Sequence, residues 1–206
     1  LRKILAAAED KSITFVVTGA LSSMAKLATS GPDAISQLTG MELIRTKLVR
    51  TVVMGGRFFT SWPMAIYPHG TDGSSGGNPV TWEWNIKATA LEDARTACDN
   101  WPGELVFSSY EIGSYIKTMV GYPSRAKKGD PVAKAYEIHN NGKGRCSWDQ
   151  TAMLDAVRPG VYWHYHIFGR ITVDDDYVTQ WTPSSEYFHS YLLPKVDYEE
   201  IRQIID

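Results

Sequence analysis

The sequence has few of the features that identify disulfide-rich, zinc-binding or membrane proteins. Only two of its 206 residues are cysteines, Cys98 and Cys146, and they lie far apart, outside any CxxC or Cys/His cluster. This spacing argues against a disulfide framework and a zinc site, so we expect two buried free thiols. No stretch reaches the ~18 consecutive apolar residues that a membrane-spanning helix needs. A membrane is therefore not an expected partner.

The chain also lacks an excess of positive charge. It has 21 Lys and Arg residues against 23 Asp and Glu residues, a formal net charge of −2. No run of three or more basic residues is present to follow a phosphate backbone, so we expect no nucleic-acid partner.

Residues 1–3 include neither an initiator Met nor a signal-like apolar block. We therefore expect the chain to be cut at its beginning, and its localisation is unknown.

Hydrophobic residues make up 43% of the chain and charged residues 21%, which is typical of a globular domain with a sizeable core. Residues 13–18 form an apolar, β-branched run, and a helical pattern over residues 21–28 follows it. A second helical pattern, over residues 32–48 and broken by Gly40, leads into a second buried strand at residues 49–54. Two such strands flanking helices predict an open, mostly parallel α/β sheet.

Later segments extend this prediction. Residues 57–82 hold a long loop rich in Pro, Gly and Ser, a kind of segment that is often functional. Thr89 and Glu92 fit a capping box at the start of a helix that reaches residue 100. The other predicted elements are a strand at 104–109, helices at 131–138 and 148–157, a hairpin of strands 162–173 and 178–181, and a last helix at 197–205. Residues 1–206 are thus predicted to be a single α/β domain that ends in a β-hairpin and a helix.

The first candidate site residues follow the predicted strands. Ligands of open α/β sheets bind beyond the carboxyl ends of the strands, which here points to Thr18 and Met54. The Thr18-Gly19 step allows the backbone to turn a carbonyl outward, as sites for hard cations require. The alternative is that Thr18 is an ordinary turn residue.

A second group of candidates lies at the end of the long loop. In extended backbone, Glu83 and Asn85 share one face while Trp82 and Trp84 take the other, and an acid beside an amide can bind vicinal hydroxyls. Asn78 is either a further residue of this pocket or a turn residue. The alternative for the pair is that Asn85 is a helix cap and Glu83 a solvated acid.

The segment SWDQTAML contains the third group. Trp148 and Asp149 open a predicted helix, where the helix dipole and the exposed amides favour a carboxylate. The alternative is that Asp149 is an ordinary acid in a first helical turn. His164 and His166 share one face of a predicted strand, but no third ligand stands at metal spacing, so we expect them to be structural.

Six segments, taken together and in order, carry a resemblance to a known family. They are VVTGALSSMAKL, RTVVMGG, WEWNIKA, WPGELVFSSYEIG, SWDQTAMLDAVRP and VDYEEIRQIID. They resemble the inosine-uridine preferring nucleoside hydrolases over nearly the whole chain, and most closely the bacterial and fungal branch with a Trp-Asp-Gln-Thr-Ala motif. The resemblance implies an α/β N-ribohydrolase of purine and pyrimidine salvage, in which a calcium ion binds the ribose hydroxyls and the attacking water.

The resemblance also implies roles for individual residues. Thr18 would give its main-chain oxygen and Asp149 its carboxylate to calcium. The residues that contact the nucleoside would be Met54, Asn78, Glu83, Asn85 and Trp148. A nucleoside or another ribosyl small molecule is then the expected partner, and a homo-oligomer is compatible with this reading.

The chain departs from the family in two ways that affect the chemistry. The Asp-x-Asp-x-x-x-Asp-Asp segment that supplies the family's general base and most calcium ligands is absent, so no catalytic base is assigned. We expect that base in a preceding segment or in a companion chain. Trp148 stands where several members have a His that protonates the leaving group, which an indole cannot do. We therefore expect this chain to be the carboxy-terminal two thirds of an enzyme, inactive alone.

Two other functions fit the same residues. One is a non-catalytic relative that binds a nucleoside or a carbohydrate. The other is an assembly protein that uses the fold as a scaffold, because the seven Trp residues suit an interface as well as a pocket. An Asp cluster in the rest of the protein would favour the enzyme.

Overall fold

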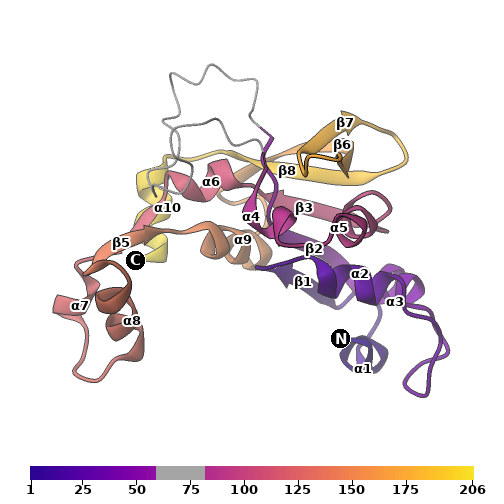
Figure 1. Ribbon diagram of the computed structural model, residues 1–206, viewed down its shortest axis with the longest axis horizontal. Coiled ribbons are helices and arrows are strands. Elements are labelled where there is room, and N and C mark those ends of the chain that lie inside the picture. Colours follow the sequence, from indigo (N-terminus) through magenta and orange to yellow (C-terminus); the bar gives the residue numbers. More distant parts are fainter. Residues whose placement is uncertain (59–81) are drawn as a thin grey trace.

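The computed structural model describes residues 1–58 and 82–206. Its centre is a six-stranded sheet in the order β1-β2-β3-β8-β6-β7 (Figure 1). The first four of these strands run parallel, whereas β6 is antiparallel to both of its neighbours, β8 and β7. The strands are β1 Ile13–Val17, β2 Leu48–Met54, β3 Glu104–Ser108, β8 Phe188–Pro194, β6 Trp163–Val173 and β7 Thr179–Pro183.

Helices cover both faces of this sheet. Val53 of β2 belongs to one buried cluster, which includes side chains from α2, α3 and α5. Its neighbour Val52 belongs to a second cluster, with side chains from α6, α9 and α10. Burial on both faces explains why β2 has a nearly continuous apolar run instead of an alternating pattern. The helices named so far are α2 Ser22–Ala28, α3 Gly40–Lys47, α5 Leu91–Cys98, α6 Tyr110–Ser114, α9 Trp148–Val157 and α10 Tyr198–Ile205.

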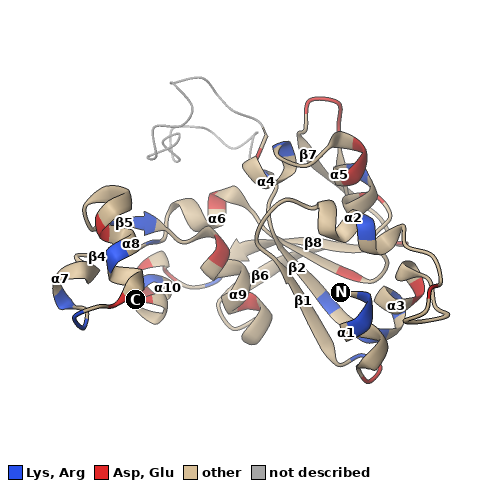
Figure 2. Cartoon of the chain, turned by 60° about the horizontal axis from the view of Figure 1, so that its bottom comes forward, with Lys and Arg blue, Asp and Glu red and all other residues tan. Residues whose placement is uncertain are grey.

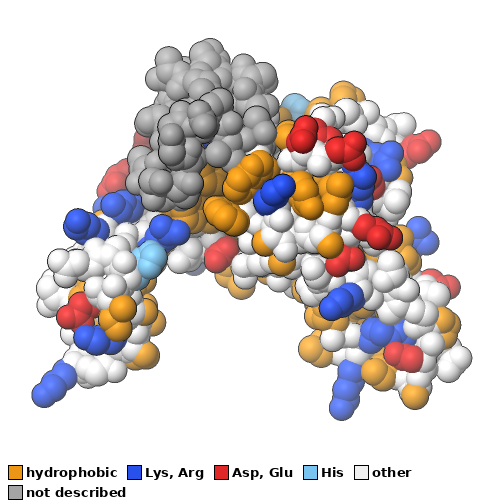
Figure 3. Space-filling view, in the orientation of Figure 1, with side chains coloured by type: hydrophobic (Ala, Val, Ile, Leu, Met, Phe, Trp, Pro, Cys, Tyr) orange, Lys and Arg blue, Asp and Glu red, His pale blue; other side chains and the backbone are white. Residues whose placement is uncertain are grey.

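A smaller lobe projects from one end of the sheet (Figure 1). It consists of β4 Lys117–Val120, α7 Tyr122–Arg125, α8 Pro131–Asn140 and β5 Lys143–Cys146, and β4 and β5 pair antiparallel. Basic and acidic side chains both lie on the lobe, as on the rest of the molecule (Figures 2 and 3). β5 leads directly into α9, and the backbone amide of Ser147 between them donates to the carbonyl of Ile116. The lobe is thereby fixed to the start of α9. Two short helices, α1 Arg2–Ala7 and α4 Trp84–Lys87, complete the described elements.

The fold class predicted from the sequence is confirmed. The sheet is mostly parallel with flanking helices, and the chain ends in the β6–β7 hairpin, β8 and α10. The helix predicted over residues 148–157 is α9 with the same bounds. The sequence did not predict β8, nor the β4–β5 pair.

The helix predicted over residues 32–48 is wrong in its first half. α3 begins only at Gly40, because Thr39 and Glu42 form a capping box there. A β-carbon at Gly40 would lie 1.6 Å from the carbonyl oxygen of Leu27. The absence of a side chain at Gly40 therefore lets the start of α3 pack directly against α2.

The capping box predicted from Thr89 and Glu92 is also wrong. The Thr89 hydroxyl donates to the carbonyl of Asn85 and accepts from the amide of Leu21, and Ala90 is the N-cap of α5. Thr89 therefore joins the turn after α4 to the segment after β1, where its buried hydroxyl finds two partners.

Both cysteines are free, as expected, although only Cys98 is buried and Cys146 is half-buried. No helix in residues 1–58 or 82–206 is long and apolar enough to cross a membrane.

Candidate functional site

A cavity of about 360 Å³ lies where the parallel strands end. Every site residue predicted from the sequence lines it, with one exception. Asn78 lies outside the described residues. The lining residues are Thr18, Met54, Glu83, Trp84, Asn85, Tyr110, Arg145, Trp148 and Asp149.

The register of the sheet brings the strand ends together. Val17 is opposite Val53 in the parallel pair of β1 and β2, and Met54 is opposite Ser108 of β3. The residues that follow these positions, Thr18 and Tyr110 among them, therefore emerge at the same edge of the sheet. This is the edge at which α/β sheets bind ligands.

Glu83 is the N-cap of α4, so the extended segment predicted around it is wrong. Its carboxylate accepts hydrogen bonds from the amides of Asn85 (2.9 Å), Ile86 (3.2 Å) and Gly56 (3.3 Å). The residue is only 5% exposed, and this burial raises the pKa of the carboxyl to about 7 although the amide hydrogen bonds act in the opposite direction. Glu83 thus takes the capping role that the sequence suggested for Asn85.

Asn85 ties the end of β2 to α4. Its side-chain nitrogen donates to the carbonyl oxygen of Met54 at 2.9 Å and lies 3.1 Å from the Met54 sulfur. This orientation leaves the side-chain oxygen of Asn85 without a hydrogen bond among the residues that the structure describes. The cavity therefore has an amide oxygen that can accept a hydrogen bond from a ligand.

Asp149 lies in the first turn of α9 and opens onto the cavity. Within the described parts of the chain its carboxylate has no ion pair and no hydrogen bond. The side chain is accessible to solvent, yet the surrounding cavity wall desolvates the carboxylate and raises its pKa. Asp149 thus gives the cavity an acid that forms no ion pair with any Lys, Arg or His in residues 1–58 or 82–206.

Trp148 forms a wall of the same cavity. Its indole nitrogen donates to the carbonyl of Tyr110 at 3.0 Å, and the two rings stack with centroids 5.6 Å apart. The Arg145 guanidinium lies 5.1 Å from the centre of the indole. Behind the tryptophan, a β-carbon at Gly113 would come within 2.4 Å of the Trp148 backbone, so α6 and α9 are in direct contact.

A calcium ion is not accommodated by the described residues alone. They contain no group of three His, Cys, Asp or Glu residues that could hold a metal ion. The predicted donors are the Thr18 carbonyl and the Asp149 carboxylate, whereas calcium takes about six to eight oxygens. The ring of His166 packs against Trp181 and Tyr191 at centroid distances of 4.1 and 4.8 Å, and it does not line the cavity.

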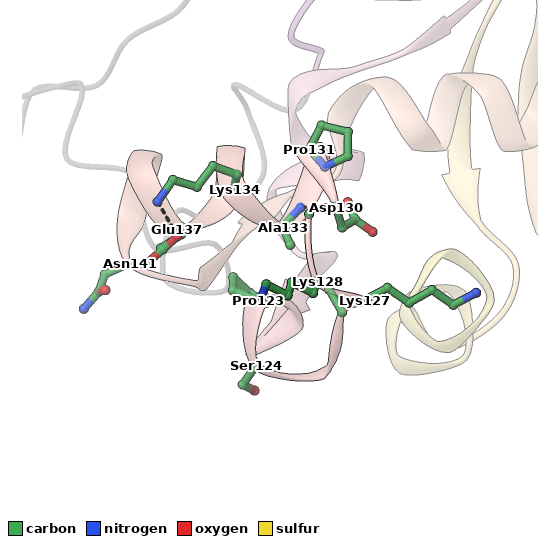
Figure 4. A pocket seen from close by; sticks show the side chains of 12 residues that line it. Pro123, Ser124, Lys127, Lys128, Asp130, Pro131, Ala133, Lys134, Glu137 and Asn141 are labelled. Atoms are coloured by element: carbon green, nitrogen blue, oxygen red, sulfur yellow. Dashed lines mark hydrogen bonds and ion pairs between the residues drawn. The ribbon is translucent and has the colours of Figure 1, made fainter.

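A larger cavity, of about 710 Å³, lies in the lobe between α7 and α8 (Figure 4). Its walls include Lys127, Lys128 and Lys134, and Lys134 forms an ion pair with Glu137 at 2.8 Å. None of the residues predicted to carry chemistry lines it. The smaller cavity at the strand ends is therefore the candidate site.

Sequence reasoning missed three residues of this site. Tyr110 follows β3 and could have been found by the rule that selected Thr18 and Met54. Trp84 was assigned to the opposite face because an extended backbone was expected. Arg145 lies in β5, a strand that was not predicted, so no feature of the sequence pointed to Arg145 as a site residue.

The sequence matches no protein-family model and none of the curated proteins. Among solved structures, the fold is similar to that of a plant nucleoside hydrolase, with 15% identity, a TM-score of 0.63, and coverage of 99% of this chain and 64% of that one. It is also similar to an inosine-uridine preferring nucleoside hydrolase from Bacillus anthracis, with 17% identity, a TM-score of 0.65, and coverage of 99% and 62%. The chain thus spans less than two thirds of the length of each. These likenesses show the nucleoside hydrolase fold, whereas the branch with the Trp-Asp-Gln-Thr-Ala motif stays a prediction.

Proposed function

We propose that the intact protein containing this chain hydrolyses the N-glycosidic bond of a ribonucleoside. The observation that carries the proposal is the cavity at the strand ends, which gathers Thr18, Met54, Asn85 and Asp149 from separate segments. The fold shared with nucleoside hydrolases supports it.

The chemistry of the cavity suits this reaction. Cleavage of a glycosidic bond passes through a state in which positive charge develops on the sugar ring. Neither the carboxylate of Asp149 nor the amide oxygen of Asn85 has a partner in the described parts of the chain. The carboxylate favours positive charge nearby, and the amide oxygen can accept a hydrogen bond from a sugar hydroxyl. Fixed groups of this kind stabilise the charged state without having to reorganise.

Calcium dependence is part of the proposal. Thr18 and Asp149 would contribute two of the oxygens, and the remaining ligands and the general base would come from outside the described residues, in another part of the protein or in a companion chain. The chain alone is then inactive. A homo-oligomer is also compatible with the proposal.

A non-catalytic nucleoside- or carbohydrate-binding protein is the second candidate. It is favoured by the internal hydrogen bonds of Glu83, whose carboxylate already caps α4. It is also favoured by Trp148, because an indole N–H is not acidic enough to protonate a leaving group and here already donates to the Tyr110 carbonyl. The fold and cavity would then serve binding alone.

One assay separates the two candidates. The intact protein is incubated with inosine or uridine and calcium, and free ribose is measured alongside the binding of each nucleoside by calorimetry. Binding with ribose release supports the hydrolase. Binding without ribose release supports the binding protein, and the absence of both contradicts the assignment of the cavity.

A further inference from the structure

Arg145 is a positively charged residue in the wall of the candidate site. Its side chain comes from β5, lines the cavity, and lies over the indole of Trp148. Within residues 1–58 and 82–206 it makes no ion pair and no hydrogen bond. Other arginines near the sheet are paired, such as Arg50 with Asp155 and Arg95 with Asp175. Arg145 therefore keeps its five N–H donors for a ligand.

The backbone holds Arg145 in this place. It is opposite Thr118 in the β4–β5 pair, and the Thr118 hydroxyl lies 2.6 Å from the hydroxyl of Ser147. Ser147 is in turn the N-cap of α9, which carries Trp148. The backbones of Arg145 and Trp148 are thus held by one short connection between β5 and α9, and the exposed guanidinium lies at the cavity wall over the indole.

During the proposed hydrolysis, negative charge develops on the leaving base, and a nearby cation can stabilise it. When the bond between the sugar carbon and the base nitrogen breaks, its electron pair goes to the base, and negative charge spreads over the ring nitrogens and oxygens. Water supplies the oxygen that joins the sugar carbon, and a proton from water or solvent ends on the base. Hydrogen bonds from a fixed cation lower the energy of the charged base while the bond breaks.

We propose that Arg145 binds the leaving base and stabilises the negative charge that develops on it, an inference that rests on the proposed hydrolase function. Arginine does not lose its proton in proteins, so Arg145 acts by hydrogen bonding and charge and not as an acid. The role also fits the chemistry of Trp148, whose indole nitrogen already donates to the Tyr110 carbonyl.

The test compares two substrates of the intact protein that differ in the leaving group. Inosine releases a base that needs stabilisation, whereas 4-nitrophenyl riboside releases a phenolate that is stable without it. Arg145→Gln should lower kcat on inosine by on the order of 10²-fold, the size of effect seen when one fixed donor to a developing negative charge is removed. On the nitrophenyl substrate the variant should stay close to wild type, and Arg145→Lys should recover part of the loss on inosine.

Lys143→Gln is the matched control, because it removes a positive charge from the same strand at a residue that does not line the cavity. It should turn over both substrates like wild type. Equal losses on both substrates in Arg145→Gln would show a merely structural role and overturn the inference, as would no loss on either. If the wild-type protein hydrolyses neither substrate, the hydrolase proposal itself fails, and the inference fails with it.

Discussion

At the scale of single residues, Glu83 shows how a local interaction overrides a sequence pattern. The alternation in TWEWN predicts an extended segment with Glu83 and Asn85 on one face. The Glu83 carboxylate instead accepts hydrogen bonds from three backbone amides, and Glu83 is the N-cap of α4. The alternation of residue types in this short segment does not reveal these hydrogen bonds. Both residues still line the cavity, although they lie at the start of a helix and not in the expected extended segment.

The raised pKa of Glu83 makes the stability of the protein depend on pH. Burial raises this pKa from its ordinary value of 4.5 to about 7. Between these two pH values the Glu83 carboxyl has lost its proton in the unfolded chain but keeps it in the folded protein. The folded state therefore loses stability as pH rises through this range. Glu83→Gln should remove this loss, measured as the free energy of unfolding in urea from pH 4 to pH 8, about the span that brackets both pKa values.

Glu92→Gln is a suitable control because Glu92 is an exposed acid on α5. It should keep the wild-type dependence on pH. A Glu83→Gln variant whose stability still falls like wild type across this range would show that the Glu83 carboxyl is not the group responsible.

At the scale of elements, α9 was predicted with its correct bounds because an apolar helical pattern begins at Trp148 and stops before Pro159. β8 was missed for the opposite reason. It lies inside the sheet, yet its buried positions include His189 and Ser190. His189 accepts from the amide of Ile171, and its other ring nitrogen is 3.1 Å from the carbonyl of Trp101. These partners lie far away in the sequence, so the buried histidine gave no sign of a core strand.

The contact between α6 and α9 requires a glycine at position 113. An added methyl group would lie 2.4 Å from the Trp148 backbone and 2.5 Å from its ring, which neither helix can accommodate without moving. Gly113→Ala should destabilise the protein by ~1–3 kcal/mol, the usual range for overpacking, as measured by urea unfolding.

Gly31→Ala provides the control, because nothing lies within 4 Å of a β-carbon there. Its effect should stay within about 0.5 kcal/mol, as for most surface changes. Equal stability of the two variants would mean that α6 and α9 are not packed in this way.

A buried ion pair fixes the other end of α9 to the sheet. Asp155 of α9 binds the guanidinium of Arg50 in β2, and the Tyr165 hydroxyl donates to the same carboxylate at 2.7 Å. Asp155→Asn should cost about 3–5 kcal/mol, because it removes the buried partner of the Arg50 charge and leaves only the half-exposed Glu104, at 3.5 Å. Glu137→Gln removes a carboxylate from an exposed pair on α8 and should cost no more than about 1 kcal/mol in the same urea experiment. Similar costs for the two variants would contradict the burial of the Arg50 pair.

At the scale of the whole molecule, the site was predictable where it depends on a general property of the fold. Parallel strands direct their carboxyl ends to one edge, so Thr18 and Met54 could be selected before the structure was known. The lobe was not predictable, because β4 and β5 are short and pair only with each other. Arg145 consequently came from a part of the chain that sequence reasoning had not connected with the sheet.

The proposed function depends most on Asp149, the acid of the cavity that has no ion pair among the described residues. The most direct measurement is ribose release from inosine by the intact protein in the presence of calcium, for the wild type, Asp149→Ala and Asp176→Ala. Asp176 is an exposed acid in the β6–β7 turn, outside the cavity, and its variant should match the wild type. We predict that Asp149→Ala abolishes ribose release while the protein stays folded. Release at the wild-type rate by Asp149→Ala would contradict the proposed function.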